Sequence, residues 1–338
     1  MARAIVHVGL PKTGSTSLQV FLMTHRDALA AQGFVYMPPR MSLHSQIEYA
    51  FIACNEVGEI VPDHIEAGIR NIQSVDDQRA LTARFESELS AKLAEAPDAT
   101  FLISCEQLGA YLRRPRQRAA LDKWLRARFT SVVYLVFVRD MADFMLSVYS
   151  EAVKRGFTGN LDHFVAHASE IPMAKTAEDW ATEFPGRVIV RMKPRSGASI
   201  YNVYADLVGM DISGLSLPKP HNRGFNAWEA RAMRLVNLMF GPAEKRSKTA
   251  RYWVLQARRV VRLFFGMGPK LKLSESQAAL IQTRYPRDVR QIVDRLQFEG
   301  PMDFRDPDRG TATVANLADA PQSDSRGKSG RKSKATSL

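Results

Sequence analysis

The chain has only two cysteines, Cys54 and Cys105, and they lie far apart among its 338 residues. This spacing gives neither a disulfide framework nor a C-x-x-C metal pair, so we expect a reducing compartment. Uncharged apolar runs are all too short to cross a bilayer, and the first predicted strand starts too early for a secretory signal to precede it. We therefore expect a cytoplasmic protein, with a peripheral position at the inner membrane surface as a further possibility.

Motifs for metal and for redox nucleotides are also missing. No G-x-G-x-x-G sequence follows a predicted strand, which argues against nicotinamide and flavin chemistry. His163 and His167 could share a helix face, but no glutamate stands at the metalloprotease position and no third ligand is near in sequence. We interpret them as a solvated pair and expect no metal.

Acidic residues are scarce relative to basic ones: 35 Asp and Glu against 47 Lys and Arg give a formal charge of +12. Between Pro242 and Lys272 there are nine basic residues and one acid, Glu244, and residues 324–338 hold five basic residues and one acid. The remainder is close to neutral, so the basic character belongs to an insertion and a tail. We expect no nucleic-acid partner.

Length and a hydrophobic content of 45% are consistent with one large domain, which we place at residues 1–310 with a basic helical segment at about 242–272. Residues 311–338 are rich in Ser, Gly and Lys and are predicted to form a disordered basic tail. Within 251–265, arginines interleave with aromatic and aliphatic residues. That pattern suits a membrane surface or a polyanionic acceptor, or else a helix that packs its aromatics into the core.

The most informative segment is residues 9–18. A β-branched run over 4–8 precedes it and an apolar helical pattern begins at Leu18, which predicts a strand, a tight loop and a helix N-terminus. A loop that leads from a strand into a helix N-terminus leaves backbone N–H groups without partners and adds the positive end of a helix dipole. Such a loop therefore favours binding of an anion. Gly9 and Gly14 let the backbone approach a ligand, and Lys12 adds a full charge.

The loop departs from the triphosphate-binding motif, in which lysine directly follows the second glycine, because Ser15 stands at that position. It instead resembles the 5′-phosphosulfate loop of the sulfotransferase family, typically P-K-[ST]-G-[ST]-[ST]. The matching residues are Pro11, Lys12, Thr13, Gly14, Ser15 and Thr16.

A second motif follows a buried strand predicted over 131–138. Arg139 ends this strand, and Ser147 lies two helical turns further on. An arginine at a strand's carboxyl end can bind a dianion with two parallel hydrogen bonds from its planar guanidinium group. The serine hydroxyl, two helical turns on, points to the same place. In the resembled family this pair holds the 3′-phosphate of 3′-phosphoadenosine 5′-phosphosulfate (PAPS). Met141 departs from the family, which often has proline there.

Both motifs lie at the carboxyl ends of strands, which predicts an α/β fold with a central parallel sheet and its ligand at that edge. The resemblance implies a P-loop-like sulfotransferase fold and a PAPS donor. The residues expected to bind the donor are Pro11, Lys12, Thr13, Gly14, Ser15, Thr16, Ser17, Arg139 and Ser147.

The resemblance also implies sulfuryl transfer to a hydroxyl or amine, with a carbohydrate or other hydroxylated acceptor expected. Lys12 would stabilise the leaving oxygen, and the acceptor's base would be Glu106, at a strand's carboxyl end, or His44, after the first helix. Two alternatives stay open: a kinase-like phosphotransferase, and a non-catalytic protein that binds a nucleotide or a polyanion.

The remaining pattern predicts one helical face from Leu18 to Leu29 and further elements along the chain. These are helices over 76–97, 115–128 and 180–184 and strands over 101–105 and 187–191.

Overall fold

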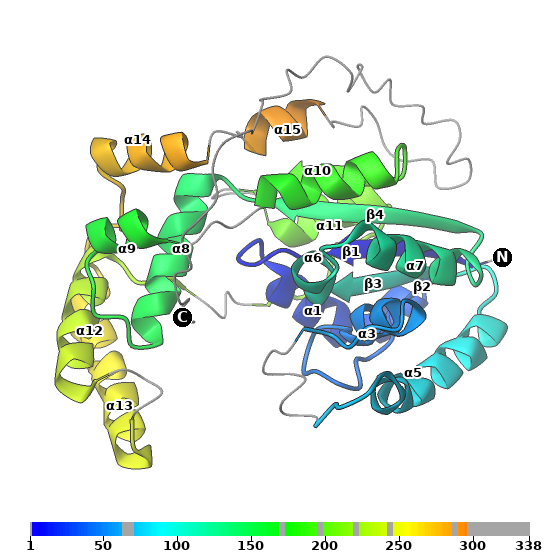
Figure 1. Cartoon of the computed structure of the whole chain (residues 1–338), viewed down its shortest axis with the longest axis horizontal. Coiled ribbons are helices and arrows are strands. Elements are labelled where there is room, and N and C mark those ends of the chain that lie inside the picture. The colour runs from blue at the N-terminus through cyan, green and yellow to red at the C-terminus, as the bar shows by residue number, and fades with distance from the viewer. Residues whose placement is uncertain are drawn as a thin grey trace, which may run out of the picture.

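The computed structural model describes residues 2–62, 71–168, 173–194, 199–218, 223–241, 246–285 and 289–295. Its strands are β1 (Arg3–Val8), β2 (Phe34–Val35), β3 (Thr100–Cys105), β4 (Ser131–Val138) and β5 (Val188–Met192). They form a five-stranded parallel sheet in the order β2-β3-β1-β4-β5 (Figure 1). The predicted α/β fold with a central parallel sheet is thus confirmed.

Strand β1 lies at the centre of the sheet, between β3 and β4. Val8, its last residue, is opposite Cys105 on β3 and Val136 on β4. Because the strands are parallel, the segments that follow β1, β3 and β4 emerge at one edge of the sheet. This edge brings the loop after Val8 close to Glu106 and Arg139.

Helices cover both faces of the sheet, because alternate strand residues point into two apolar cores. Val6, Ile103 and Val136 face one core, built with α3 (Glu48–Glu56), α5 (Val75–Glu95), α7 (Pro115–Arg126) and α10 (Met173–Glu183). Ile5, Leu102 and Leu135 face the other, built with α1 (Ser15–Thr24), α2 (Arg26–Ala30) and α11 (Ile200–Val208).

Most elements predicted between the two motifs are confirmed, with small shifts at their ends. Helix α5 matches the prediction over 76–97 and is capped by Ser74, whose hydroxyl accepts a hydrogen bond from the Asp77 amide at 3.0 Å. The single helix predicted from Leu18 to Leu29 is wrong, since α1 ends at Thr24 and α2 begins at Arg26. Between them His25 leaves the helical conformation, and its Nε2 lies 2.8 Å from the Ser216 carbonyl oxygen.

The remaining helices of the described residues are α6 (Gln107–Tyr111), α8 (Met141–Lys154), α9 (Leu161–His167), α12 (Ala227–Phe240), α13 (Lys248–Phe265), α14 (Glu275–Arg284) and α15 (Val289–Arg295). In Figure 1, α12 and α13 lie beyond α8, on the side away from the sheet. A separate apolar cluster joins the three helices, with Tyr149 and Val153 of α8 packed near Met233, Val254 and Val261.

The basic segment contains α13, while residues 242–245 lie outside the described part. Val254 and Val261 are the α13 side chains that are buried, whereas Trp253 and Phe264 are 55% and 73% exposed. The interpretation in which this helix packs its aromatics into the core is therefore wrong. Within the described residues, no helix combines the length and apolar character that crossing a bilayer requires. The predicted tail, 311–338, lies outside the described residues.

Candidate functional site

The loop between β1 and α1 turns through two residues with left-handed backbone conformations. Lys12 has φ 63° and Gly14 has φ 103°. A non-glycine residue in this region is uncommon, and such conformations cluster at ligand-binding sites. A Cβ on Gly14 would lie 2.9 Å from Cδ1 of Ile200, a side-chain end that can shift, so the left-handed backbone conformation is what favours glycine there.

Two of the predicted donor-binding hydroxyls stabilise the loop itself. The Thr13 hydroxyl donates to the Leu10 carbonyl oxygen at 2.7 Å, and the Ser15 hydroxyl donates to the same oxygen at 3.3 Å. Both side chains are buried. Their hydroxyl hydrogens therefore hold the turn closed, which leaves the backbone amides, Lys12 and the hydroxyls of Thr16 and Ser17 as the loop's groups for an anion.

The N-terminus of α1 has no side-chain cap. Gly14 is the N-cap residue, and no side chain accepts a capping hydrogen bond there. The first amides of a helix have no intrahelical partners, so the amides of Ser15, Thr16 and Ser17 are suited to an external anion. Thr16 is exposed, while Ser17 and Pro11 are half-buried.

Gly9 makes its close backbone approach to the chain itself. A Cβ on Gly9 would lie 2.6 Å from Cα of Glu106, and a Cβ on Gly109 would lie 2.5 Å from the Gly9 carbonyl oxygen. The Gly9 amide donates to the Cys105 carbonyl oxygen at 2.9 Å. Gly9 therefore lets the loop pack directly against the end of β3 and the start of α6.

Arg139 joins the two predicted motifs. Its Nη1 donates to the Lys12 carbonyl oxygen at 3.1 Å, across 127 residues of sequence. The amino group of Lys193, directly after β5, donates to the same oxygen at 3.3 Å. Three cationic residues from the ends of three neighbouring strands thus meet at one loop.

Sequence reasoning missed Lys193, although a signal for it was present. A lysine that directly follows a buried strand occupies the same kind of position as Arg139 after β4. Its Cε would lie 3.7 Å from a Cβ on Gly14, so the lysine side chain runs over the loop. The position of β5 beside β4 brings it there, and the order of strands could not be known from the sequence.

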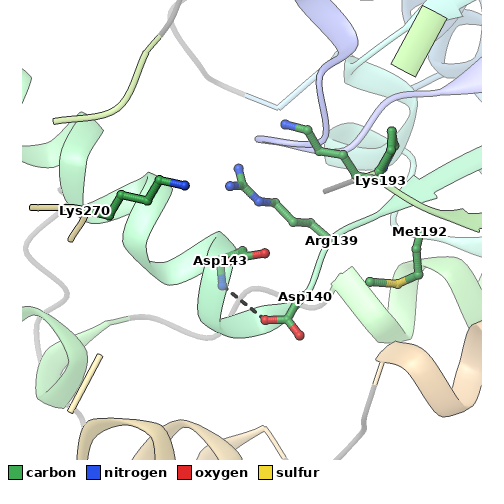
Figure 2. A pocket seen from close by; sticks show the side chains of 7 residues that line it. Arg139, Asp140, Asp143, Met192, Lys193 and Lys270 are labelled. Atoms are coloured by element: carbon green, nitrogen blue, oxygen red, sulfur yellow. Dashed lines mark hydrogen bonds between the residues drawn. The ribbon is translucent and has the colours of Figure 1, made fainter. Parts of the chain in front are cut away.

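A cavity of about 530 Å³ adjoins these residues. Its lining residues are Arg139, Asp140, Asp143, Met192, Lys193, Pro194 and Lys270. Figure 2 shows the charged ends of Arg139, Lys193 and Lys270 pointing into this space. Asp140 caps α8, since its carboxylate accepts hydrogen bonds from the amides of Ala142 and Asp143 at 3.0 and 3.2 Å.

The cations of this cavity are partly removed from water and repel one another. Burial lowers the pKa of Arg139, although Asp143 and Asp140 act in the opposite direction. Burial, and then the charge of Arg139, lowers the pKa of Lys193 to about 8. Groups in this situation gain stability when an anion binds among them.

Helix α8 lines the other side of the loop. The Lys12 amino group lies 3.5 Å from the carboxylate of Glu151. Burial raises the pKa of Glu151, but the charges of Lys12 and neighbouring cations outweigh it and lower the pKa overall. Ser147 lies four residues from both Asp143 and Glu151 and so shares their helix face. Its half-buried side chain is thus on the side of α8 that faces the cations.

The two candidate bases lie in neighbouring segments at the carboxyl end of β3. The Glu106 amide donates to the Ser45 hydroxyl at 3.2 Å, and that hydroxyl donates to Oε1 of Gln107 at 2.5 Å. Glu106 is the N-cap of α6, but its side chain accepts no capping hydrogen bond. His44 directly precedes Ser45, and its carbonyl oxygen accepts a hydrogen bond from the Tyr36 hydroxyl at 3.2 Å. Both residues stay candidates for the base.

The histidine pair on α9 lies outside this site. The rings of His163 and His167 stack with centroids 4.3 Å apart, and both side chains are exposed. Among the described residues, no group of three His, Cys, Asp or Glu side chains could hold a metal ion. The β1–α1 loop gathers open backbone amides and cationic side chains, an arrangement that suits an anion.

Comparison with solved structures finds a sulfotransferase from Alicyclobacillus acidocaldarius, with 14% sequence identity and a TM-score of 0.39. The similarity covers 86% of this chain and 98% of that chain. No family model matches the chain, and no curated protein matches it.

Proposed function

We propose that this protein transfers a sulfuryl group from PAPS to a hydroxyl or amine of an acceptor, with carbohydrates as the leading acceptor class. The main support is the hydrogen bond from Arg139 to the Lys12 carbonyl oxygen, because it unites the two motifs that resemble the donor-binding segments of sulfotransferases. A donor with phosphate groups at both ends needs two neighbouring cationic positions, and these residues provide them.

The two ends of the donor would bind different parts of the site. The 5′-phosphosulfate would lie at the open N-terminus of α1, with the amides of 15–17 and the Lys12 amino group. The 3′-phosphate would lie near Arg139 and Ser147, where Lys193 adds a charge that the family pattern did not predict. The 530 Å³ cavity beside Arg139 offers space for part of the nucleotide.

The transfer needs one bond to form as another breaks. The acceptor oxygen or nitrogen attacks the sulfur, the bond from sulfur to the bridging oxygen breaks, and its electron pair stays on the 5′-phosphate. Lys12 stabilises the charge that develops on this oxygen, which lowers the barrier because that charge is largest in the transition state. Glu106 or His44 accepts the acceptor's proton.

Calorimetric titration with 3′-phosphoadenosine 5′-phosphate tests the donor. We expect binding to wild type, and a loss of about 10- to 100-fold for Arg139→Ala, as for removal of a charged hydrogen-bonding group. Arg126→Ala is the matched control, because Arg126 is an exposed arginine on α7. Equal affinity in wild type and Arg139→Ala contradicts the proposed donor site.

A donor-exchange assay tests the reaction. With labelled PAPS and a panel of sugars, we expect label on the acceptor and a fall in kcat of about 100-fold or more for Lys12→Ala, with an unchanged melting temperature. Labelled ATP should give no transfer. Transfer from ATP favours the phosphotransferase alternative, and nucleotide binding that survives Lys12→Ala without any transfer favours the binding-protein alternative.

A further inference from the structure

Helix α13 exposes an apolar stripe to solvent along its length. Trp253, Val260 and Phe264 are spaced by seven and four residues, so they share one helix face. They are 55%, 52% and 73% exposed. Tyr252 and Leu263 extend the stripe on one flank and are exposed as well. Single exposed apolar residues are common, whereas a continuous stripe marks an interaction surface.

A basic stripe runs beside this apolar one. The exposed basic residues of α13 on that flank are Lys248, Arg251 and Arg259. Arg262 is also exposed, but its Nε lies 3.9 Å from the buried carboxylate of Glu229 on α12.

Val254 and Val261 pack into the cluster with α8 and α12, and each lies one residue, about 100° of helix rotation, from a member of the apolar stripe. The side of α13 opposite these two valines carries Tyr252, Arg259 and Leu263. Apolar and basic side chains therefore face outward together on that side of the helix.

Helix α12 and the segment after α13 enlarge the surface. On α12, Leu235, Leu238 and Met239 are all more than half exposed. Trp228 is also exposed, and it packs beside Gly268, where a Cβ would lie 2.9 Å from its indole ring. We define the α12–α13 surface as the exposed apolar and basic residues of these two helices together with Met267.

We propose that the α12–α13 surface docks on a bilayer containing anionic lipids. An amphipathic helix with aromatic residues on one side and Lys and Arg beside them lies in the headgroup region and gains from both apolar burial and charge attraction. No helix among the described residues is suited to span a bilayer, so the contact is peripheral. This inference depends on the surface alone and not on the proposed sulfuryl transfer.

Charge argues against the same surface joining two copies of this chain. The segment from Pro242 to Lys272 has nine basic residues and one acid. Symmetric pairing would bring two such segments together, and like charges in contact oppose association. An anionic bilayer complements the same charges.

Co-sedimentation with vesicles tests the proposal, using the full chain. We expect binding to vesicles of equimolar phosphatidylglycerol and phosphatidylcholine and no binding to phosphatidylcholine alone. The double variant Leu263→Ser with Phe264→Ser should reduce partitioning at least tenfold, and Arg251→Gln with Arg259→Gln by about tenfold or more. These four side chains are exposed, so the variants should melt at the wild-type temperature.

Two matched controls remove similar groups from other helices. Lys123→Gln with Arg126→Gln removes two exposed charges from α7, and Leu280→Ser removes an exposed leucine from α14. Both should bind vesicles as wild type does. If the α7 variant loses as much binding as the α13 charge variant, the attraction belongs to the whole protein and the proposal is wrong.

Tryptophan fluorescence separates insertion from simple charge attraction. Trp124 and Trp180 are buried, so a vesicle-induced blue shift and quenching by brominated phosphatidylglycerol would report Trp228 and Trp253. The proposal is overturned by vesicle binding without these changes, which indicates a polyanion site. It is equally overturned if the Leu263/Phe264 variant binds vesicles as well as wild type does. It is also overturned if wild type binds no vesicles and forms a dimer, while the Leu263/Phe264 variant is a monomer.

Discussion

The amino group of Lys12 lies 3.5 Å from the carboxylate of Glu151, so a side chain of α8 holds the lysine of the β1–α1 loop. The same carboxylate lies 3.3 Å from Nε of Arg155 and 3.9 Å from the amino group of Lys154. An anion that binds the loop must share or replace Glu151 as the partner of Lys12. The carboxylate also repels that anion, so it opposes binding in two ways.

Glu151→Gln should therefore tighten binding of 3′-phosphoadenosine 5′-phosphate. Because both side chains of the ion pair are partly exposed, we expect a gain of about two- to fivefold. Calorimetric titration measures it, and Glu95→Gln, which removes an exposed carboxylate paired with Lys92, should leave the affinity unchanged. Weaker binding by Glu151→Gln would mean that Glu151 instead positions Lys12 for the ligand.

Lys193 should make the affinity for this bisphosphate depend on pH. Burial and the charge of Arg139 lower its pKa to about 8, and a bound anion favours the protonated amine. Affinity should therefore fall as pH rises through about 8. Lys193→Met should bind more weakly at neutral pH and lose this dependence, while Lys193→Arg should keep the affinity and also lose the dependence. A dependence that persists in both variants would assign it to another group.

Gly9→Ala should destabilise the fold through a backbone clash. The new Cβ would lie 2.6 Å from Cα of Glu106, and neither backbone segment can move without shifting the central strands. We expect a loss of about 1–3 kcal/mol in the free energy of unfolding. Denaturant titration measures it, with Gly224→Ala as the control because its Cβ would make only ordinary contacts. Equal stability of the two variants would show that the loop can move aside.

His7 should make stability depend on pH in the acid range. It is buried on β1, its Nδ1 lies 2.8 Å from the Ser104 hydroxyl, and burial lowers its pKa to about 3 from 6.5. Between these two pH values His7 binds a proton in the unfolded chain but not in the folded chain. The stabilisation that depends on neutral His7 is therefore fully present above pH 6.5 and is lost as the pH falls toward 3.

Replacing His7 should remove that dependence. One such group contributes about 1.4 kcal/mol per pH unit to the slope of the unfolding free energy against pH. His7→Gln should reduce that slope by up to this amount. Denaturant titrations at several pH values measure it. The exposed His167 serves as the control, and an equal change of slope in His167→Gln would contradict the assignment to His7.

The local elements were predictable because their signals are local. The buried run before Arg139, the helical pattern of α5 and the strand-to-helix loop at 9–14 each depend on neighbouring residues. The break at His25 was not predictable, because the partner of its ring is a carbonyl far along the chain, at Ser216. The exposure of Trp253 was equally hidden, since amphipathic periodicity does not say which face of a helix finds a partner.

The sequence by itself determined the parallel α/β class, the strand–loop–helix corner around Lys12 and the strand-end position of Arg139, because hydrophobic period and turn residues act over a few positions. Only the tertiary structure decided that Lys193 joins them, that Glu151 holds Lys12, and that Thr13 and Ser15 bind the loop's own carbonyl. These contacts depend on strand order and helix packing, which the whole core sets at once.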